Sequence, residues 1–403
     1  MILTKVGDLL GFPKNHLINF VLKYIKKAIP KYTLNSIINF QSTIENTTDH
    51  SLDPVDLNGD DLAFLQYTGG TTGLSKGAMI SHKNMVYNLH QSKAWQGNLF
   101  DDVEVIIAIT ALPLYHIFSL QSNCLAMMLD GGENVLITNP RDFPAFVKEL
   151  KKHKFVYITG VNTLYASLLN TPGFDEVNFT ALRFTIGGGM AIQKAVSKDW
   201  EKITGQPILQ AYGLTETSPA AVVNPIDITE FNGSIGLPIS STEVSIRDDQ
   251  GENIAIGELG EICIRGPQVM VGYWEQPDET AKVMLPDNWF KTGDIGRMDE
   301  QGYIYIEDRK KDMILVSGFN VYPNELEQAL TQHPDVLECA AIGIADPKAG
   351  EVVKMFVVAN NDSLTTEQVV EFCKANMAAY KVPKYVEFRA DLPKSNVGKV
   401  LRK

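Results

Sequence analysis

Cysteine is scarce in this chain, and the cysteines present are scattered. The 403 residues include four of them, at positions 124, 263, 339 and 373, and no CxxC motif. This pattern excludes a disulfide framework and a cysteine-rich metal site, and it is typical of a reduced compartment. The longest apolar run, 105–114, is interrupted by Thr110 and Pro113, and it is shorter than the roughly 18 residues that a membrane-spanning helix needs. The amino terminus has no secretory signal pattern, so we expect a cytoplasmic protein.

An excess of positive charge is also missing. The chain has 36 basic and 48 acidic residues, which leaves a net charge of −12. Because so acidic a surface repels phosphate backbones, nucleic acid is excluded as a partner. Internal repeats and low-complexity tracts are absent as well. With 44% hydrophobic and 21% charged residues, the composition is that of a globular protein, and the length predicts more than one domain.

One segment near the amino terminus has a distinct charge pattern. Residues 16–31 mix large apolar side chains with Lys23, Lys26 and Lys27, and Lys14 precedes them. On a helix this gives an apolar side with a basic edge, which suits peripheral contact with the inner, anionic face of the cell membrane. A helix that packs its apolar side on the protein core and leaves its lysines solvated has the same pattern. Both interpretations remain open on the sequence, as does the oligomeric state.

Strand and helix patterns alternate from residue 61 to about 230. Short β-type runs are found at 63–67, 104–110, 134–138, 155–159 and 183–186, and helical patterns at 142–152, 162–169 and 192–204. This alternation predicts an α/β fold in which helices cover mainly parallel sheets.

The sequence pattern changes twice towards the carboxyl end. Over 233–308 glycines recur and runs such as 243–247 and 261–265 alternate apolar with polar residues, which predicts a small antiparallel β-roll. Residues 309–403 then mix helical and β patterns and predict a small α+β domain. We therefore expect a large domain over 1–308, which includes the roll, and a small domain over 309–403.

The strongest local signal is the segment 67–77, YTGGTTGLSKG, between a strand pattern and a helix pattern. Its loop can turn backbone N–H groups and hydroxyls towards a polyphosphate, and a lysine adds positive charge. It is not a Walker A loop, because Ser75 precedes Lys76 and Gly77 follows it. A plain glycine-rich surface turn would also fit the pattern. The candidate phosphate-binding residues are Thr68, Gly69, Gly70, Thr71, Thr72, Gly73 and Lys76.

This segment resembles the phosphate loop of the adenylate-forming enzymes, the superfamily of acyl-CoA synthetases and luciferases. Five further segments resemble family motifs in the family's order: 112–118 (LPLYHIF), 187–190 (GGGM), 212–216 (YGLTE), 288–311 (NWFKTGDIGRMDEQGYIYIEDRKK) and 393–399 (PKSNVGK). The resemblance runs along the whole chain and is strongest to the bacterial acid–CoA ligases of the long-chain fatty acid branch. It implies activation of a fatty acid by ATP to acyl-AMP, with release of pyrophosphate, and then transfer to coenzyme A.

The resemblance assigns nucleotide-binding roles to several motif residues. It implies that Glu216 and Thr68 hold Mg²⁺, a hard cation that takes carboxylate oxygen. It implies that Asp294 accepts the ribose hydroxyls and that Arg309 donates to the ribose or the α-phosphate. The adenine would lie against Tyr212, with further nucleotide contacts from Gly188, Gly189, Gly213 and Thr215.

Each of these residues also has an ordinary structural interpretation. Glu216 could be an acid at a helix start, and Asp294 a turn residue. Arg309 could be a surface residue paired with Asp308, and Tyr212 a core residue.

The resemblance also assigns the catalytic groups. Two anions approach each other when a carboxylate attacks the α-phosphorus, so the site must supply positive charge, and Lys399 is the candidate. Its ordinary interpretation is a solvated lysine near the end of the chain. His116 would orient the acyl carboxylate, although a histidine in so apolar a run is often a core residue. Lys311 would be the hinge about which the small domain turns between the two half-reactions.

The turn over 316–320 completes the expected sites. The resemblance implies that Gly318, Phe319 and Asn320 line the pantetheine channel of coenzyme A, although a simple β-turn would look the same. Family members usually carry a longer segment before the phosphate loop, and this chain ends soon after the catalytic lysine. A truncated chain would expose apolar surface, from which we expect marginal stability. The alternatives are an enzyme that activates aryl acids or loads carrier proteins, and a nucleotide-binding fragment without activity.

Overall fold

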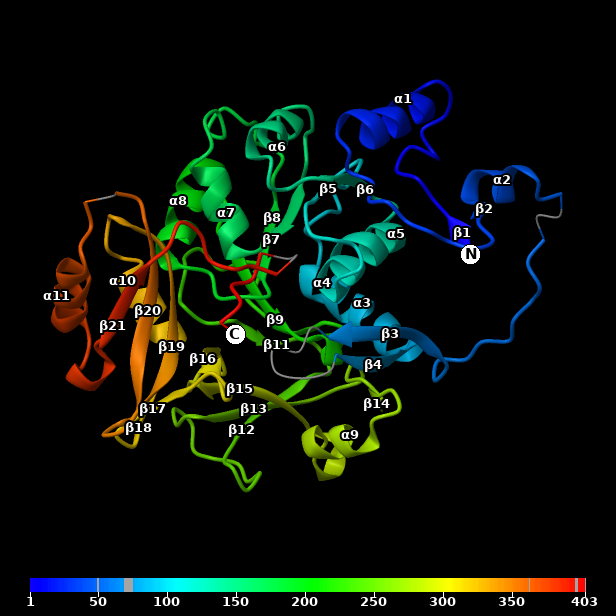
Figure 1. Ribbon diagram of the computed structural model, residues 1–403. Coiled ribbons are helices and arrows are strands. Elements are labelled where there is room, and N and C mark those ends of the chain that lie inside the picture. The colour runs from blue at the N-terminus through cyan, green and yellow to red at the C-terminus, as the bar shows by residue number, and fades with distance from the viewer. Residues whose placement is uncertain (49–50, 69–74, 362, 396–397, 403) are drawn as a thin grey trace. The chain divides into compact units, whose positions relative to one another are not determined.

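The structure is a computed structural model that describes residues 1–48, 51–68, 75–361, 363–395 and 398–402. It contains two compact units, Met1–Leu57 and Asn58–Lys403 (Figure 1). Within its described residues, no helix is long and apolar enough to cross a membrane.

The first unit is small and has little core of its own. Its elements are β1 (Ile2–Leu3), α1 (Lys14–Phe20), a π-helical turn η1 (Val21–Ile25), β2 (Ile38–Asn39) and α2 (Phe40–Glu45), and β1 pairs in parallel with β2. The predicted helix over 16–31 therefore forms only as far as Ile25. Its large apolar side chains, Leu17, Phe20, Tyr24 and Ile25, are 54% to 65% exposed. They form no core within this unit.

The second unit is built on a seven-stranded sheet of order β11-β10-β9-β8-β7-β5-β6. Its strands are β5 (Ile107–Thr110), β6 (Glu133–Leu136), β7 (Tyr157–Gly160), β8 (Phe184–Gly188), β9 (Leu209–Gly213), β10 (Ala220–Val223) and β11 (Leu237–Pro238). The pairs from β6 to β9 are parallel, and β10 and β11 extend the sheet antiparallel. This confirms the predicted α/β fold class.

Helices cover both faces of this sheet because its strands bury side chains on both sides. On one face Ile158 packs with Leu150 of α6 (Phe143–Leu150), Leu168 of α7 (Asn162–Leu169) and Trp200 of α8 (Lys194–Thr204). On the other face the neighbouring Tyr157 packs with residues of α5. The helical elements near that face are α3 (His82–Gln96), α4 (Ile117–Ser119), the π-helical turn η2 (Leu120–Leu125) and α5 (Ala126–Asp130) (Figure 1).

The strand predicted at 63–67 belongs to a different sheet from the one expected. It forms β3 (Leu62–Thr68), which pairs antiparallel with β4 (Lys76–Ser81), and β4 pairs antiparallel with β14 (Gly272–Tyr273). The run of alternating elements suggested that it joins the parallel sheet, and this expectation was wrong. The short connection between β3 and β4 allows only antiparallel pairing, since a parallel pair needs a long crossover.

The predicted roll is a four-stranded antiparallel sheet of order β12-β13-β15-β16. Its strands are β12 (Glu243–Arg247), β13 (Gly260–Arg265), β15 (Phe290–Met298) and β16 (Ile304–Arg309). The helix α9 (Pro277–Val283) follows β14, and short 3₁₀ turns occur at η3 (Thr215–Thr217) and η4 (Pro286–Asn288). The sheet thus carries the 288–311 motif on two neighbouring strands.

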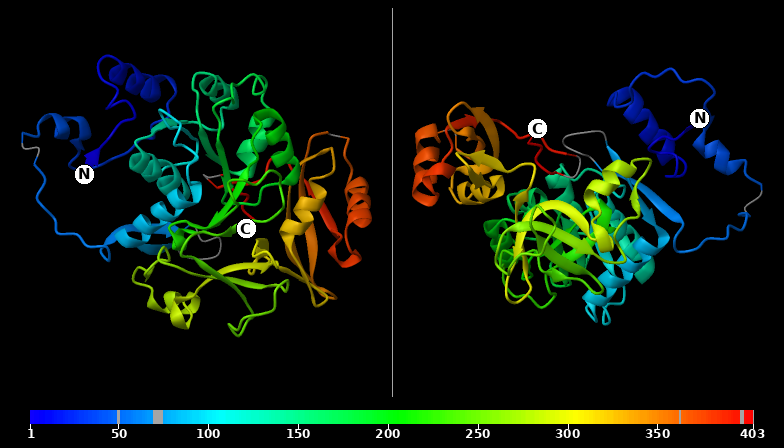
Figure 2. Two further views of the ribbon diagram at one scale, coloured as in Figure 1. Left: turned by 180° about the vertical axis from the view of Figure 1, so that it is seen from behind. Right: turned by 90° about the horizontal axis from the view of Figure 1, so that it is seen from below.

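The carboxyl-terminal part is a five-stranded sheet with two helices. It contains β17 (Ile314–Val316), β18 (Phe319–Val321), α10 (Pro323–Leu330), β19 (Val336–Asp346), β20 (Gly350–Ala359), α11 (Thr366–Asn376), the 3₁₀ turn η5 (Ala379–Lys381) and β21 (Tyr385–Phe388). It has its own core around Leu326, Met355 and Val369. After β21 the described chain returns towards the large sheet, where Gly398 contacts Thr163 of α7 (Figures 1 and 2).

Candidate active site

Two adjoining cavities of about 750 Å³ each lie between the large sheet, the roll and the carboxyl-terminal segment. Their walls share Gly189, Tyr212, Gly213, Arg309, Lys311 and Lys399. The second cavity is also lined by Thr68, His116, Gly188, Thr215 and Glu216, and the first by Asp294. The folded chain therefore gathers residues from motifs that lie up to several hundred positions apart.

The nucleotide-binding candidates of the large sheet sit at the carboxyl ends of β8 and β9. Ligands bind outside this edge in open α/β sheets. Gly188 ends β8, and a Cβ built on it would lie 3.0 Å from the carbonyl oxygen of Ala211 on β9. Tyr212 is buried yet lines both cavities, so it is not merely a core residue. A flat aromatic surface is thus available at this edge.

Tyr212 is joined to the ribose-binding candidate by a hydrogen bond. Its Oη donates to Oδ2 of Asp294 at 2.7 Å. Asp294 lies within β15, not in a turn, and its other oxygen is 3.0 Å from Nε of Arg309 on β16. Burial and the nearby Asp294 charge raise the pKa of Tyr212 well above its usual range, so the phenol stays a donor. The Asp294 charge also raises the pKa of Arg309.

The expected alternative partner of Arg309 is engaged elsewhere. Asp308 is fully buried and accepts hydrogen bonds from the backbone N–H groups of Arg309 and Asn324, at 2.7 and 2.6 Å. Its charge partner is Arg402, with Nη1 3.4 Å from Oδ1. Arg309 is therefore directed to Asp294 and the cavity.

Lys399 reaches the cavity because its loop is closed on itself and attached to the large sheet domain. The N–H of Ser395 donates to the carbonyl of Lys399 at 2.8 Å, and the N–H of Gly398 donates to the carbonyl of Ser395 at 3.0 Å. The hydroxyl of Thr163, on α7, donates to the carbonyl of Gly398 at 3.2 Å. Lys399 is consequently a half-buried cavity residue and not a solvated lysine.

The surroundings of Lys399 disfavour its charged form. Burial, followed by the positive charge of Arg309, lowers its pKa to about 8, while Asp294 acts in the opposite direction. A cation held in such a place is stabilised when an anion arrives, which suits a residue that meets a phosphate or a carboxylate.

His116 lies at the start of α4, on the wall of the second cavity. Its Nδ1 accepts a hydrogen bond from the backbone N–H of Phe118 at 3.3 Å, so in the neutral ring Nε2 carries the proton. Burial, and secondarily the charge of Lys399, lower the pKa of His116. A neutral imidazole with one N–H to offer is therefore the form present at neutral pH.

Glu216 is the acidic residue of the second cavity. It lies in the 3₁₀ turn η3 and is only 8% exposed. Its Oε1 accepts a hydrogen bond from Tyr273 at 2.7 Å, and within the described residues Oε2 has no hydrogen-bond donor. The Thr68 hydroxyl, on the same cavity wall, makes a long 3.4 Å hydrogen bond to the carbonyl of Lys76. One carboxylate oxygen and one hydroxyl thus fit Mg²⁺ held chiefly by nucleotide phosphates.

The described part of the chain contains no cluster of three metal-ligating side chains, so a cage made by the protein alone is absent there. The remaining phosphate-loop candidates, Gly69, Gly70, Thr71, Thr72 and Gly73, lie outside the described residues. Lys76 is described and forms an ion pair with Glu279 of α9. It is not among the residues that line either cavity.

The candidates for coenzyme A are not brought to these cavities. Gly318, Phe319 and Asn320 lie at the β17–β18 turn, where Gly318 has a φ of 85° and Phe319 stacks on Tyr380. Phe319 is 56% exposed. The hinge candidate Lys311, in contrast, lines both cavities.

Comparison with known sequences identifies the family. The sequence model described as AMP-binding enzyme matches residues 19–274, and the one described as AMP-binding enzyme C-terminal domain matches residues 325–399. The chain belongs to the AMP-binding enzyme family. The second match covers most of the carboxyl-terminal part, from α10 onward, and ends at Lys399.

Relatives of known name agree with this assignment. The chain is 53% identical over its whole length to a long-chain-fatty-acid–CoA ligase of Escherichia coli O157:H7, of which it covers 72%, and 38% identical to one of Bacillus subtilis strain 168, with the same coverage. Among solved structures, the o-succinylbenzoate CoA synthetase of Bacillus subtilis, in complex with its acyl-adenylate intermediate, has a TM-score of 0.80 and 29% identity. The match covers 91% of this chain and 73% of that one.

Several residues of this AMP-binding enzyme's site were missed by the sequence analysis. Tyr273 holds Glu216, Thr163 holds the Lys399 loop, and Arg402 contacts Glu327 and Asp308. Their partners are 57 to 235 positions away in the chain, so no local pattern marks them. Arg402 carries the one local signal, since it is a basic residue three positions after Lys399 of the 393–399 motif.

Proposed function

We propose that this chain ligates a long-chain fatty acid to coenzyme A in an ATP-dependent, AMP-forming reaction. The observation that carries the proposal is that Lys399, from the carboxyl-terminal segment, lies in the same cavity as Tyr212, His116 and Glu216. The acyl class is supported by the relatives, which are named long-chain-fatty-acid–CoA ligases at about half identity over the full chain.

In the first half-reaction a carboxylate oxygen of the fatty acid attacks the α-phosphorus of ATP. The bond from the α-phosphorus to the bridging oxygen breaks, and pyrophosphate leaves with that electron pair. The Lys399 ammonium lowers the repulsion between the two anions and stabilises the charge that develops on the phosphoryl oxygens. His116 offers its Nε2 proton as a hydrogen bond to the acyl carboxylate. Both residues come from the wall of one cavity.

The nucleotide is oriented by the neighbouring residues. Tyr212 gives the adenine a flat surface, with Gly188, Gly189, Gly213 and Thr215 along the same edge. Asp294 accepts from the ribose hydroxyls, and Arg309 donates to the ribose or the α-phosphate.

Glu216 and Thr68 are the protein groups that would hold Mg²⁺, which neutralises phosphate charge when it is bound. Lys76 and the loop Gly69, Gly70, Thr71, Thr72 and Gly73 would hold the outer phosphates.

In the second half-reaction the thiolate of coenzyme A attacks the acyl carbonyl, and AMP leaves with the electrons of the acyl–oxygen bond. The turn of Gly318, Phe319 and Asn320 lines neither cavity, so it can serve coenzyme A only after a rearrangement. We propose that residues 309–403 turn as a domain against 1–308, with Lys311 at the pivot. A step of this kind removes Lys399 from the site before the thiol arrives.

The test of the first half-reaction is the direct detection of acyl-AMP. Incubation of the chain with oleate, ATP and Mg²⁺ should give oleoyl-AMP by mass spectrometry. Lys399→Ala should abolish it while thioester formation from supplied oleoyl-AMP and coenzyme A continues. Lys384→Ala is the control, because it removes a lysine of the same region that pairs with Asp346 on the surface. Absence of acyl-AMP from the unaltered chain would instead indicate a nucleotide-binding fragment without activity.

The acyl class needs its own test. Apolar side chains such as Phe118, Phe184 and Val223 line the second cavity together with His116, which favours a hydrocarbon chain. Pyrophosphate release with palmitate, octanoate and benzoate in competition should be highest for palmitate. Preference for benzoate would favour the aryl-acid alternative, and release that needs a carrier protein in place of coenzyme A would favour the carrier-loading one.

We also propose that residues 16–31 contact an anionic membrane surface. The exposed apolar side chains of α1 and η1 and the exposed Lys23, Lys26 and Lys27 together support it. Each lysine near such a surface contributes about 1 kcal/mol. Replacing the three lysines with glutamine should reduce co-sedimentation with phosphatidylserine vesicles, whereas the same change at Lys148, Lys151 and Lys152 of the α6 region should not. Equal sedimentation of both variants would contradict the proposal.

A further inference from the structure

Glu216 is held at two points, by the segment that leads into β14 and by β14 itself. Its backbone carbonyl accepts from the N–H of Met270 at 2.8 Å, and its Oε1 accepts from the Tyr273 hydroxyl at 2.7 Å. Both residues of this second contact are buried, with Tyr273 6% and Glu216 8% exposed. A hydrogen bond from a neutral donor to a buried carboxylate is stronger than one between neutral groups, so it fixes the rotamer of Glu216.

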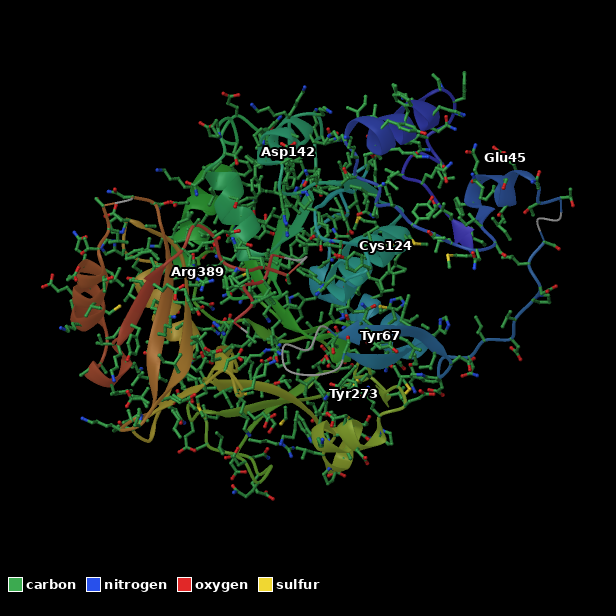
Figure 3. The ribbon with its side chains drawn as sticks, viewed as in Figure 1. Glu45, Tyr67, Cys124, Asp142, Tyr273 and Arg389 are labelled. Carbon is green, nitrogen blue, oxygen red and sulfur yellow. The ribbon has the colours of Figure 1, made fainter. Side chains whose placement is uncertain are left out.

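Tyr273 is itself fixed by the sheet and by α9. It pairs with Ala78 in the β4–β14 register, and its N–H donates to Oγ1 of Thr280 at 2.8 Å. Figure 3 shows Tyr273 in the region where β14 meets α9. The ring is therefore placed by backbone pairing on one side and by a helix on the other.

Tyr273 also contacts Lys76, the lysine of the phosphate loop. Lys76 Nζ lies 5.0 Å from the centre of the Tyr273 ring, and its ion-pair partner Glu279 is on α9. One tyrosine thus contacts the carboxylate through its hydroxyl and the lysine through its ring face. A cation over the face of an aromatic ring is attracted by the quadrupole of the ring.

From this geometry we infer that Tyr273 is a positioning residue of the adenylation step. Its hydroxyl occupies Oε1 of Glu216 and leaves Oε2 to face the cavity and the metal–nucleotide complex. The inference rests on the proposed function. Groups that orient a metal-binding carboxylate in this way typically change metal affinity about 10- to 100-fold when they are removed.

Tyr273→Phe tests the inference because it removes only the hydroxyl. Manganese binding, followed by electron paramagnetic resonance with a non-hydrolysable ATP analogue present, should weaken about 10-fold. The Mg²⁺ concentration that half-saturates acyl-AMP formation should rise by a similar factor, with the KM for the fatty acid unchanged. Thioester formation from supplied acyl-AMP should remain as in the unaltered chain.

A matched control is available on β16. Tyr305→Phe removes a hydroxyl that donates to Asp299 at 3.1 Å, and neither residue lines either of the two cavities described above. Manganese affinity should not change in this variant. If the Tyr273→Phe variant also binds manganese as tightly as the unaltered chain, the inference is overturned. This holds even if the unaltered chain makes acyl-AMP. If the unaltered chain makes no acyl-AMP, the proposed function fails, and the resonance measurement still decides the inference.

A double-mutant cycle separates positioning from general packing. In a Glu216→Gln background, Tyr273→Phe should cause little further loss of manganese affinity, since its effect passes through the carboxylate. Additive losses in the two single variants and the double variant would show that Tyr273 acts through the fold alone, and would overturn the inference.

Discussion

Asp294 and Arg309 face each other across β15 and β16, with Arg309 Nε 3.0 Å from Asp294 Oδ1. The register of the two strands sets this pair, and Tyr212 occupies the second oxygen of the carboxylate. A carboxylate has about four lone-pair sites, so it can accept further hydrogen bonds without losing these two partners. The ribose-binding candidate is therefore oriented before a nucleotide arrives.

Asp294→Asn should raise the KM for ATP. The change removes the charge that pairs with Arg309 and weakens the acceptor for the ribose hydroxyls. A hydrogen bond to a charged group contributes about 1.5–3 kcal/mol, which corresponds to about a 10- to 100-fold rise. Pyrophosphate release at varied ATP measures it. Glu243→Gln, which breaks an exposed ion pair with Arg265, is the control and should leave the KM unchanged. An unaltered KM in Asp294→Asn would contradict the assignment.

Arg402→Gln should slow adenylation more than thioester formation. Arg402 lies three residues after Lys399, and its Nη2 donates to Asn324 at 2.6 Å and to Glu327 at 2.8 Å. These contacts hold the carboxyl-terminal segment against α10. We expect acyl-AMP formation to fall about tenfold or more, by loss of a buried charge pair. Arg389→Gln, which removes a surface pair with Glu387, should have no such effect. Equal losses in both half-reactions would count against this role.

The loss of stability in Arg402→Gln should depend on pH. Burial raises the pKa of Glu327 and of Asp308, and Arg402 opposes that rise. Without Arg402 these folded-state pKa values rise further above their unfolded values, so stability is retained at low pH and is lost as pH increases. Urea unfolding should therefore show a larger deficit at pH 8, about 3–5 kcal/mol, than at pH 5. A deficit that does not change with pH would exclude the two carboxyls as its cause.

Much of the fold could be predicted from periodicity, and the errors concern pairing. The helix expected at 162–169 and the strand expected at 243–247 form with those bounds as α7 and β12. The strand at 63–67 also forms, but its partner is β4. Its pairing could not be predicted, because a strand pattern indicates which residues are extended and not which sheet edge they join. The strands β9 and β10 were missed, because the glycine and alanine in them weaken a β pattern.

The candidate site shows the same division. Sequence motifs predict Tyr212, Lys399 and Glu216 as site residues, and these residues line the second cavity. The residues that hold them, Tyr273 and Thr163, act across 57 and 235 positions. Such contacts depend on the folded topology, so the sequence alone could not indicate them.

Gly213→Ala should be strongly destabilising although the φ of Gly213 is ordinary. A Cβ at this position would overlap the backbone carbonyl of Pro219, at the point where β9 meets β10. A backbone cannot move aside as a side chain can, so we expect a loss of about 3 kcal/mol in the free energy of unfolding. Gly189→Ala is the comparison: its φ of 75° costs about 1–2 kcal/mol, but its Cβ would lie 3.8 Å from the nearest atom, on Val161. A smaller loss at Gly213 than at Gly189 would contradict this argument.

The adenylation rate should decline above pH 8. The pKa of Lys399 is lowered to about 8, and the role proposed for this residue requires its ammonium form. We therefore expect kcat/KM for ATP to fall about tenfold for each pH unit above that value. His116 does not cause this decline, because its pKa is lowered and it is neutral throughout the range. Pyrophosphate release without coenzyme A isolates the step from ionisation of the thiol. In Lys399→Arg the guanidinium stays charged, so the slower variant should show no decline up to pH 10. A decline that persists in this variant would assign the titration to another group and remove Lys399 as its origin.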